Sequence, residues 1–246
     1  MSFPLLGTRP RLVPTILVGL AFLILLGLGT WQVERLAWKT NLLNTITTRM
    51  KAPPRSLAGP DVGRIDDYER VRVTGHFVHD REIHLLARSL QGELGYHIVT
   101  PFAVDGDGTV LINRGFVPQD RRDPATRGEG QVQGTVDVTG LVRYPHKPGL
   151  AFALPDNRPA ENVWIWLDLP QISQTVGMPA LAPFVIDADA TPNPGGLPIG
   201  GQTRLEVPND HLQYALTWYG LAVALVIMFI VYHRRPPRSA TVERKH

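Results

Sequence analysis

Two long uncharged apolar stretches, one near each end, constrain this 246-residue chain more than any other feature. Leu12 to Trp31 and Leu212 to Tyr232 contain no Asp, Glu, Lys or Arg. At about 1.5 Å per residue, each stretch forms a helix of roughly 30 Å, long enough to cross the hydrocarbon core of a bilayer. Neither stretch has the polar face that a helix packed in a soluble domain normally shows. The sequence therefore predicts two transmembrane helices and contact with a lipid bilayer.

Basic residues beside the spans predict the topology. A basic tail follows the second span, and Arg9 and Arg11 precede the first; basic residues also follow the first span closely, so the tail decides the orientation. We expect both termini in the cytoplasm and the central segment in the periplasm or an equivalent intermembrane space. The first stretch exceeds a signal-peptide core of about 7–15 residues, and no small-x-small cleavage site follows it, which indicates a retained anchor.

The chain divides into six expected segments. The amphipathic stalk is predicted because Leu36, Leu43 and Met50 share one helix face and Pro53-Pro54 ends the pattern. The segments are an N-terminus (1–11), a first span (12–31), a helical stalk (32–52), an extracytoplasmic domain (53–208), a second span (209–232) and a basic tail (233–246).

The extracytoplasmic domain has the pattern of a mostly antiparallel, β-rich (α+β) fold, because short strand-like runs alternate with turn signals. Asp105 to Gly108 is a strong hairpin turn, Trp164 to Leu169 could be a strand, and Pro170 to Val176 begins like a short helix. The other expected strands are 68–78, 82–86, 96–104, 109–117, 135–144 and 184–189. The pattern does not tell whether the sheet closes into a barrel.

Composition excludes several functions. The chain has no cysteine, which rules out disulfides, thiolate metal sites and cysteine nucleophiles. Its net charge of +3 is small and reflects membrane topology, so no nucleic-acid partner is expected. No metalloprotease, phosphate-binding, serine-hydrolase or dinucleotide-binding motif occurs in a suitable context, and we predict that the chain is not an enzyme.

The entry to the second span is the first candidate site. On a helix, His211, Tyr214, Ala215 and Trp218 share one face. A neutral imidazole can ligate haem iron, which makes His211 a candidate metal ligand, and the aromatic rings of Tyr214 and Trp218 could flank a porphyrin. The alternative is an interfacial aromatic belt with a histidine at the helix start.

The exit of the first span is the second candidate. Trp31, Arg35 and Trp38 fall on one face, where Arg35 could pair with an acidic group such as a haem propionate. The alternative is a snorkelling anchor between belt residues. Small residues such as Gly27, Gly220 and Ala224 could let the two helices touch and bring both faces to one site.

Asn113 and Arg114 form a third candidate, because they interrupt an otherwise apolar strand and could face a partner. The alternative is structural: a buried arginine–carboxylate pair with a bulge at Gly115.

Blocks of sequence spread over residues 12 to 235 resemble the surfeit locus family of cytochrome c oxidase assembly factors. Each block alone is weak, but their order between two terminal spans is specific, and the clearest departure is Phe116, where the family often has Trp. The blocks are Gly29 to Lys39, Val71 to Phe77, Gly95 to Phe102, Asn113 to Pro118, Glu161 to Trp164 with Asp168, and Asn209 to Trp218.

The resemblance implies a role in maturing the haem-a-containing catalytic subunit of the oxidase, with haem a bound transiently and His211 as its ligand. Possible partners are that catalytic subunit and haem a synthase. The N-terminal segment lacks an Arg/Ser-rich transit peptide, which favours a bacterial inner (plasma) membrane. A scaffold that stabilises an assembly intermediate without binding haem fits the same resemblance, and a membrane-anchored hydrolase or quinone-linked enzyme is the third hypothesis.

Overall fold

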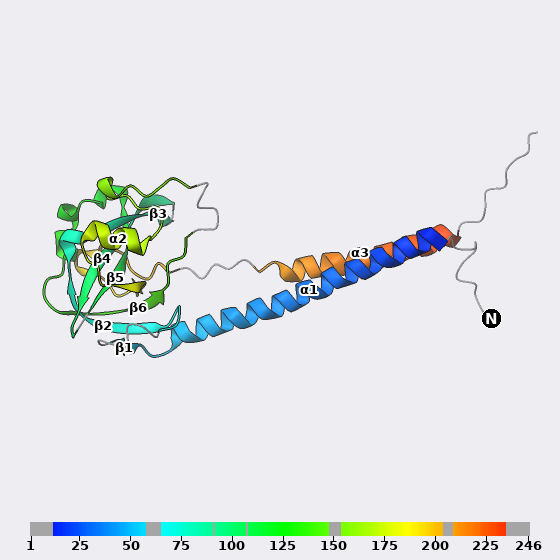
Figure 1. The fold of residues 1–246 in the computed structure, drawn as a ribbon, viewed down its shortest axis with the longest axis horizontal. Helices are drawn as coiled ribbons and strands as arrows, with labels where there is room; N and C mark the ends of the chain where they lie inside the picture. Colours follow the sequence, from blue (N-terminus) through cyan, green and yellow to red (C-terminus); the bar gives the residue numbers. More distant parts are fainter. Residues whose placement is uncertain are drawn as a thin grey trace, which may run out of the picture. The chain divides into compact units, whose positions relative to one another are not determined.

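The computed structural model describes residues 12–57, 65–90, 92–106, 108–147, 154–203 and 209–234. The chain separates into two compact units: residues 1–44 with 206–246, and residues 45–205. The first unit is helical and the second is built on a β-sheet (Figure 1). The predicted class, two membrane-spanning helices flanking a mostly antiparallel β-rich domain, is confirmed.

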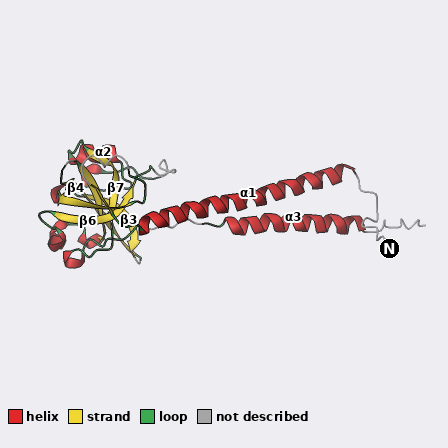
Figure 2. Cartoon of the chain, turned by 90° about the horizontal axis from the view of Figure 1, so that it is seen from below, coloured by secondary structure: helices red, strands yellow, loops and turns green. Residues whose placement is uncertain are grey.

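Helix α1 (Leu12–Lys51) and helix α3 (His211–Arg234) are long and apolar enough to cross a membrane. Helix α1 continues without a break beyond the apolar stretch, and it ends at Lys51, just before Pro53-Pro54 as predicted. Proline cannot continue a helix because it lacks the N–H and its ring clashes with the preceding turn. In the first unit α1 and α3 lie side by side, as Figure 1 and Figure 2 both show.

The described residues of the second unit form one seven-stranded sheet in the order β1-β2-β6-β7-β5-β4-β3. All neighbours are antiparallel except the pairs β1–β2 and β5–β7. The strands are β1 Arg55–Leu57, β2 Arg70–Phe77, β3 Ile83–Leu90, β4 Glu93–Val104, β5 Thr109–Pro118, β6 Val136–Arg143 and β7 Leu181–Ala188. Short 3-10 helices connect them: η2 His79–Arg81, η3 Gln119–Arg121, η4 Pro124–Gly130, η6 Pro159–Glu161 and η7 Pro194–Gly196.

The sheet closes into a barrel, because β2 pairs with β4 in addition to its neighbours β1 and β6. Gly75 is the residue at which β2 passes from β6 to β4: it pairs with Val136 on one side and Val104 on the other. A Cβ at Gly75 would lie 2.0 Å from the Ala103 carbonyl oxygen. Only glycine permits this approach, so Gly75 is required where the barrel closes.

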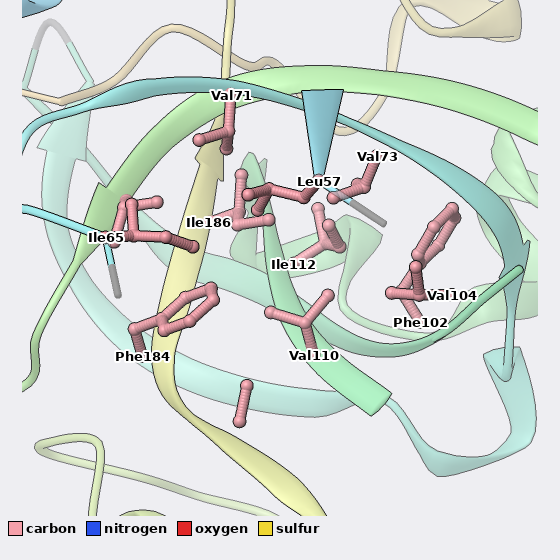
Figure 3. Packing of buried hydrophobic residues seen from close by; sticks show 12 residues of the cluster. Leu57, Ile65, Val71, Val73, Phe102, Val104, Val110, Ile112, Phe184 and Ile186 are labelled. Atoms are coloured by element: carbon pink, nitrogen blue, oxygen red, sulfur yellow. The ribbon is translucent and has the colours of Figure 1, made fainter. Parts of the chain in front are cut away.

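The interior of the barrel holds one apolar cluster. Alternate residues of each strand point inward, so Val110 and Ile112 of β5 meet Phe184 and Ile186 of β7 (Figure 3). The intervening residue Leu111 belongs to a second cluster on the opposite face of the sheet. Because both faces of β5 are covered here, Val110, Leu111 and Ile112 are consecutive apolar residues and do not alternate with polar ones.

Helix α2 (Leu169–Val176) covers this second cluster with Ile172 and Val176, which lie one turn apart. The Asp168 side chain caps the helix by accepting a hydrogen bond from the Gln171 amide at 3.1 Å. The short helix predicted over 170–176 is therefore confirmed, but the strand expected over 164–169 is wrong. That segment makes only an isolated bridge from Trp164 to Leu85 before α2 begins.

Candidate functional site

Helices α1 and α3 contact each other through small and polar residues. The buried residues are Gly29 and Gln32 on α1 and Ala215 and Ala222 along α3, with His233 at its end. A Cβ at Gly29 would lie 2.8 Å from Cε1 of Tyr219, so the missing side chain leaves room for that ring. The hydroxyl groups of Tyr219 and Thr30 lie 3.1 Å apart and share a hydrogen bond.

The predicted contact through Gly27 and Gly220 is wrong. A Cβ at either position would meet nothing within 4 Å. Two residues turn an α-helix by more than half a revolution, so Gly29 faces α3 and Gly27 faces away from it. A close helix contact was correctly expected, but its register was not.

His211 is the first residue of α3, and its imidazole reaches across to α1. Its Nδ1 lies 2.7 Å from Oε1 of Gln32, and Gln32 is only 9% exposed. Among the described residues, His211 Nε2 has no hydrogen-bond partner. The geometry therefore holds Nδ1 of the ring against α1 and leaves Nε2 without a partner in the described chain.

The other residues predicted for this site are exposed. Tyr214 and Trp31 are each 54% exposed, and Trp218 is half-buried. The Arg35 guanidinium carbon lies 4.0 Å from the centroid of the Trp38 ring, so these two side chains stack as a cation–π pair. Within the described ranges, no hydrogen bond, ion pair or ring contact joins Trp31 or Arg35 to His211. The structure brings Gln32 to His211, and the sequence pattern did not single out Gln32.

Asn113 and Arg114 lie on β5 at a bulge, where the register with β4 shifts between Ile98 and Val99. The Asn113 amide nitrogen donates to Oδ1 of Asp187 at 2.8 Å. Arg114 is 1% exposed; it packs on the Phe77 ring and donates to the Gly130 carbonyl. The bulge is confirmed, but the expected arginine–carboxylate pair is wrong, because carbonyl, amide and imidazole groups surround Arg114 in the described part of the chain. Burial lowers the pKa of Arg114 to about 10, so the side chain stays charged at neutral pH.

A buried charge cluster, which the sequence did not reveal, joins the loops at this end of the barrel. Oε1 of Glu82 accepts hydrogen bonds from Arg127 and, at 3.0 Å, from Nε2 of His84. His84 Nδ1 accepts in turn from Nε of Arg122 at 2.9 Å, so the proton of the neutral ring lies on Nε2. The Glu82 and Arg127 side chains are 5% and 1% exposed, which makes this a buried ion pair between the residue that directly precedes β3 and a residue of η4.

Glu82, His79 and His97 also have shifted pKa values. Desolvation raises the pKa of Glu82, but the hydrogen bonds from His84 and Arg127 outweigh it and hold this pKa below its ordinary value. Desolvation lowers the pKa of His79 and of His97, and the opposing effects of the Val132 carbonyl and of Asp187 are smaller. Both histidines are therefore held neutral in the folded protein.

Two membrane-length helices and a small closed barrel define the class: a membrane-anchored protein with one β-barrel domain. The model of the SURF1 family matches residues 19–223, and the chain belongs to that family. Surfeit locus protein 1 of Mus musculus is 40% identical over 230 residues, which cover 86% of this chain and 73% of the mouse protein.

Two further relatives give the same result. Surfeit locus protein 1 of Homo sapiens is 39% identical over 217 residues, covering 80% of this chain and 70% of the human protein. A SURF1-like protein of Monosiga brevicollis is 39% identical over 224 residues, covering 85% of this chain and 83% of that protein. The family resemblance read from the sequence blocks is confirmed.

Proposed function

We propose that this protein is a cytochrome c oxidase assembly factor that binds haem a through His211 and helps insert it into the catalytic subunit. The observation that carries the proposal is the His211 imidazole at the first residue of α3, with Nδ1 bonded to Gln32 and Nε2 without a partner in the described chain. A single imidazole is the ligand that an iron already held by a porphyrin requires. The membership of the SURF1 family supports the assembly role.

The neighbouring residues fit the other needs of a haem. Tyr214 and Trp218 follow His211 along α3, in its first two turns. Tyr214 is exposed and Trp218 is half-buried, so both rings can contact the faces of a flat apolar ligand. Arg35 carries a charge beside exposed Trp31 and Trp38, where it can pair with a propionate. Bound haem a would supply the iron that the imidazole ligates; the protein supplies the reversible ligand, the apolar contacts and the cation.

The proposed membrane location and partners rest on the sequence and on the family. The barrel domain lies in the periplasm of a bacterial inner membrane and both termini lie in the cytoplasm, as the basic C-terminal tail predicts. The partners are the catalytic subunit of the oxidase and, for delivery of haem a, the haem a synthase. The protein holds and transfers its ligand without catalysing a reaction.

The test is the visible absorption spectrum of the full-length protein, purified in detergent from cells that make haem a. The wild type is expected to carry haem, and His211→Ala to lose it. His146→Ala is the matched control, since His146 is an exposed loop histidine outside the helix pair. Equal haem content and identical spectra in the wild type and His211→Ala would refute the ligand role.

A scaffold function is the second candidate, and the hydrogen bond between His211 and Gln32 favours it in one respect: it can serve helix pairing alone. On this alternative, the barrel holds an assembly intermediate and His211 only joins α3 to α1. His211→Asn, which keeps a polar group able to bond Gln32, would then support oxidase assembly fully in cells. Haem ligation instead predicts loss of assembly in that variant.

A further inference from the structure

We propose that Gln32 is a positioning residue for His211: its amide oxygen fixes the imidazole in the Nδ1–H tautomer and directs Nε2 toward the ligand. The inference rests on the proposed haem function and extends it to a residue of the other helix. It begins from the 2.7 Å distance between Gln32 Oε1 and His211 Nδ1.

The first step concerns why an amide is buried in this helix pair. Gln32 is 9% exposed, and in α1 only Gly29 and Gln32 are buried among the described residues. An unpaired amide in an apolar contact is destabilising because it loses its hydrogen bonds to water, so Gln32 needs a partner. His211 provides that partner, and the interaction holds the ring in one orientation.

The second step concerns the proton. A neutral imidazole has one N–H and one lone pair. When Nδ1 donates to the Gln32 oxygen, Nε2 holds the lone pair, which is the form that ligates a metal. The two nitrogens flank Cε1, and their N–H and lone-pair directions diverge, so a ring with Nδ1 against Gln32 directs Nε2 away from the Gln32 amide.

The third step separates positioning from helix pairing. If the contact served pairing alone, Gln32 could equally donate its NH₂ group to Nδ1, and the proton would then lie on Nε2 and block ligation. Positioning requires Gln32 to accept. Glutamate at position 32 can only accept a hydrogen bond, and methionine, of similar length, neither donates nor accepts one well. These two substitutions therefore distinguish positioning from helix pairing.

The experiment uses full-length protein in detergent with Gln32→Glu, Gln32→Met and Thr30→Val. Thr30→Val is the matched control because it removes another polar contact between the helices, the one with Tyr219. In haem-free protein, ¹⁵N chemical shifts of the His211 ring report the tautomer. Titration with haem reports the affinity, and far-ultraviolet circular dichroism verifies that each variant is helical.

We expect the Nδ1–H tautomer in the wild type, Gln32→Glu and Thr30→Val, and loss of this preference in Gln32→Met. Haem affinity should fall about 10–100-fold in Gln32→Met, the usual effect of removing a partner of a metal-binding histidine. Gln32→Glu should retain haem and lower the reduction potential of the iron, because a more negative acceptor makes the imidazole more electron-donating.

Three results would overturn the proposal: the Nε2–H tautomer in the wild type, an unchanged tautomer and affinity in Gln32→Met, or a loss of haem in Gln32→Glu as large as in Gln32→Met. Failure of the haem function has a different signature. If the wild type binds no haem but shows an Nδ1–H tautomer that Gln32→Met abolishes, the positioning role of Gln32 is supported and the haem function is refuted.

Discussion

Replacing Arg127 by methionine should destabilise the barrel strongly at pH 7 and much less at pH 5. Arg127 and Glu82 form a buried ion pair, and the variant leaves the Glu82 carboxylate 5% exposed without its cation. Such a carboxylate avoids the penalty of a buried charge by taking up a proton. The energetic effect is therefore bounded by the free energy of that protonation.

The bound follows from the ordinary glutamate pKa of 4.5. At about 1.36 kcal/mol per pKa unit, protonating Glu82 costs about 3.4 kcal/mol at pH 7 and about 0.7 kcal/mol at pH 5. Arg127 also donates to the carbonyls of Arg121 and Arg122, each at 3.2 Å. These bonds add about 1 kcal/mol each at either pH. The pH-dependent part of the destabilisation is thus about 2.7 kcal/mol.

Thermal unfolding of the detergent-purified protein at pH 7 and pH 5 tests this bound. For a protein of this size, 1 kcal/mol shifts the Tm by about 2–4 °C, so the Tm loss caused by Arg127→Met should be roughly 5–10 °C larger at pH 7 than at pH 5. In the double variant Glu82→Gln/Arg127→Met the dependence should vanish, since no carboxylate remains.

Arg121→Met is the matched control, because Arg121 belongs to the same loops but its side chain is 50% exposed. It should change the Tm little at either pH, as exposed ion pairs contribute about 0–1 kcal/mol. An equal Tm loss for Arg127→Met at both pH values would refute the reasoning. So would a Tm loss that remains pH-dependent in the double variant Glu82→Gln/Arg127→Met.

Three further predictions concern Gly75, His97 and Gly29, and the two glycine predictions have matched control variants. Gly75→Ala places a Cβ 2.0 Å from the Ala103 oxygen and should cost about 1–3 kcal/mol, seen as a lower Tm, whereas Gly128→Ala meets nothing within 4 Å; equal Tm values would contradict this account of barrel closure. Because burial lowers the pKa of His97, the unfolded chain takes up a proton that the fold excludes, and stability should fall as the pH drops through about 6.5, by at most about 1.4 kcal/mol per pH unit. His97→Gln should reduce the slope of Tm against pH, and an unchanged slope would show that His97 is not responsible. Gly29→Leu should displace the Tyr219 ring and weaken haem binding, while Gly27→Leu should not; equal haem affinity in both variants would argue against the observed helix register.

Local patterns in the sequence predicted the elements of this fold well. The two spans follow from length and absence of charge, and the β4–β5 hairpin from two strand-like runs on either side of a glycine-containing turn. Closure of the barrel was not predictable in this way, because the pairing of β2 with β4 joins residues far apart in the chain. The glycine at position 75 is necessary for closure, but its sequence neighbours do not indicate what it approaches.

The wrong strand over 164–169 shows how two local signals can compete. Trp164-Ile165-Trp166-Leu167 is apolar and aromatic, which favours a strand. Asp168 and Pro170 are the cap and an early residue of a helix, and they determine the outcome because the chain must turn before α2. Trp164 is fully buried even so, which satisfies the apolar pattern without a strand.

The sequence analysis singled out one partner of the hydrogen bond between His211 and Gln32, but not the other. His211 was identified because an imidazole at the start of an apolar span can ligate haem iron, whereas Gln32 was not, because an amide at the end of a span is ordinarily explained by contact with water. In the structure this amide faces the other helix, and the hydrogen bond joins residues 179 positions apart in sequence. A buried polar group within an apolar helix pair requires a partner. The end of the first span and the start of the second thus form one contact surface and not two separate membrane boundaries. This surface consists of Gly29, Thr30 and Gln32 of α1 and His211, Ala215 and Tyr219 of α3. A variant that disrupts the packing of α1 against α3 would then alter the ligand geometry directly, so loss of helix pairing is expected to reduce haem binding.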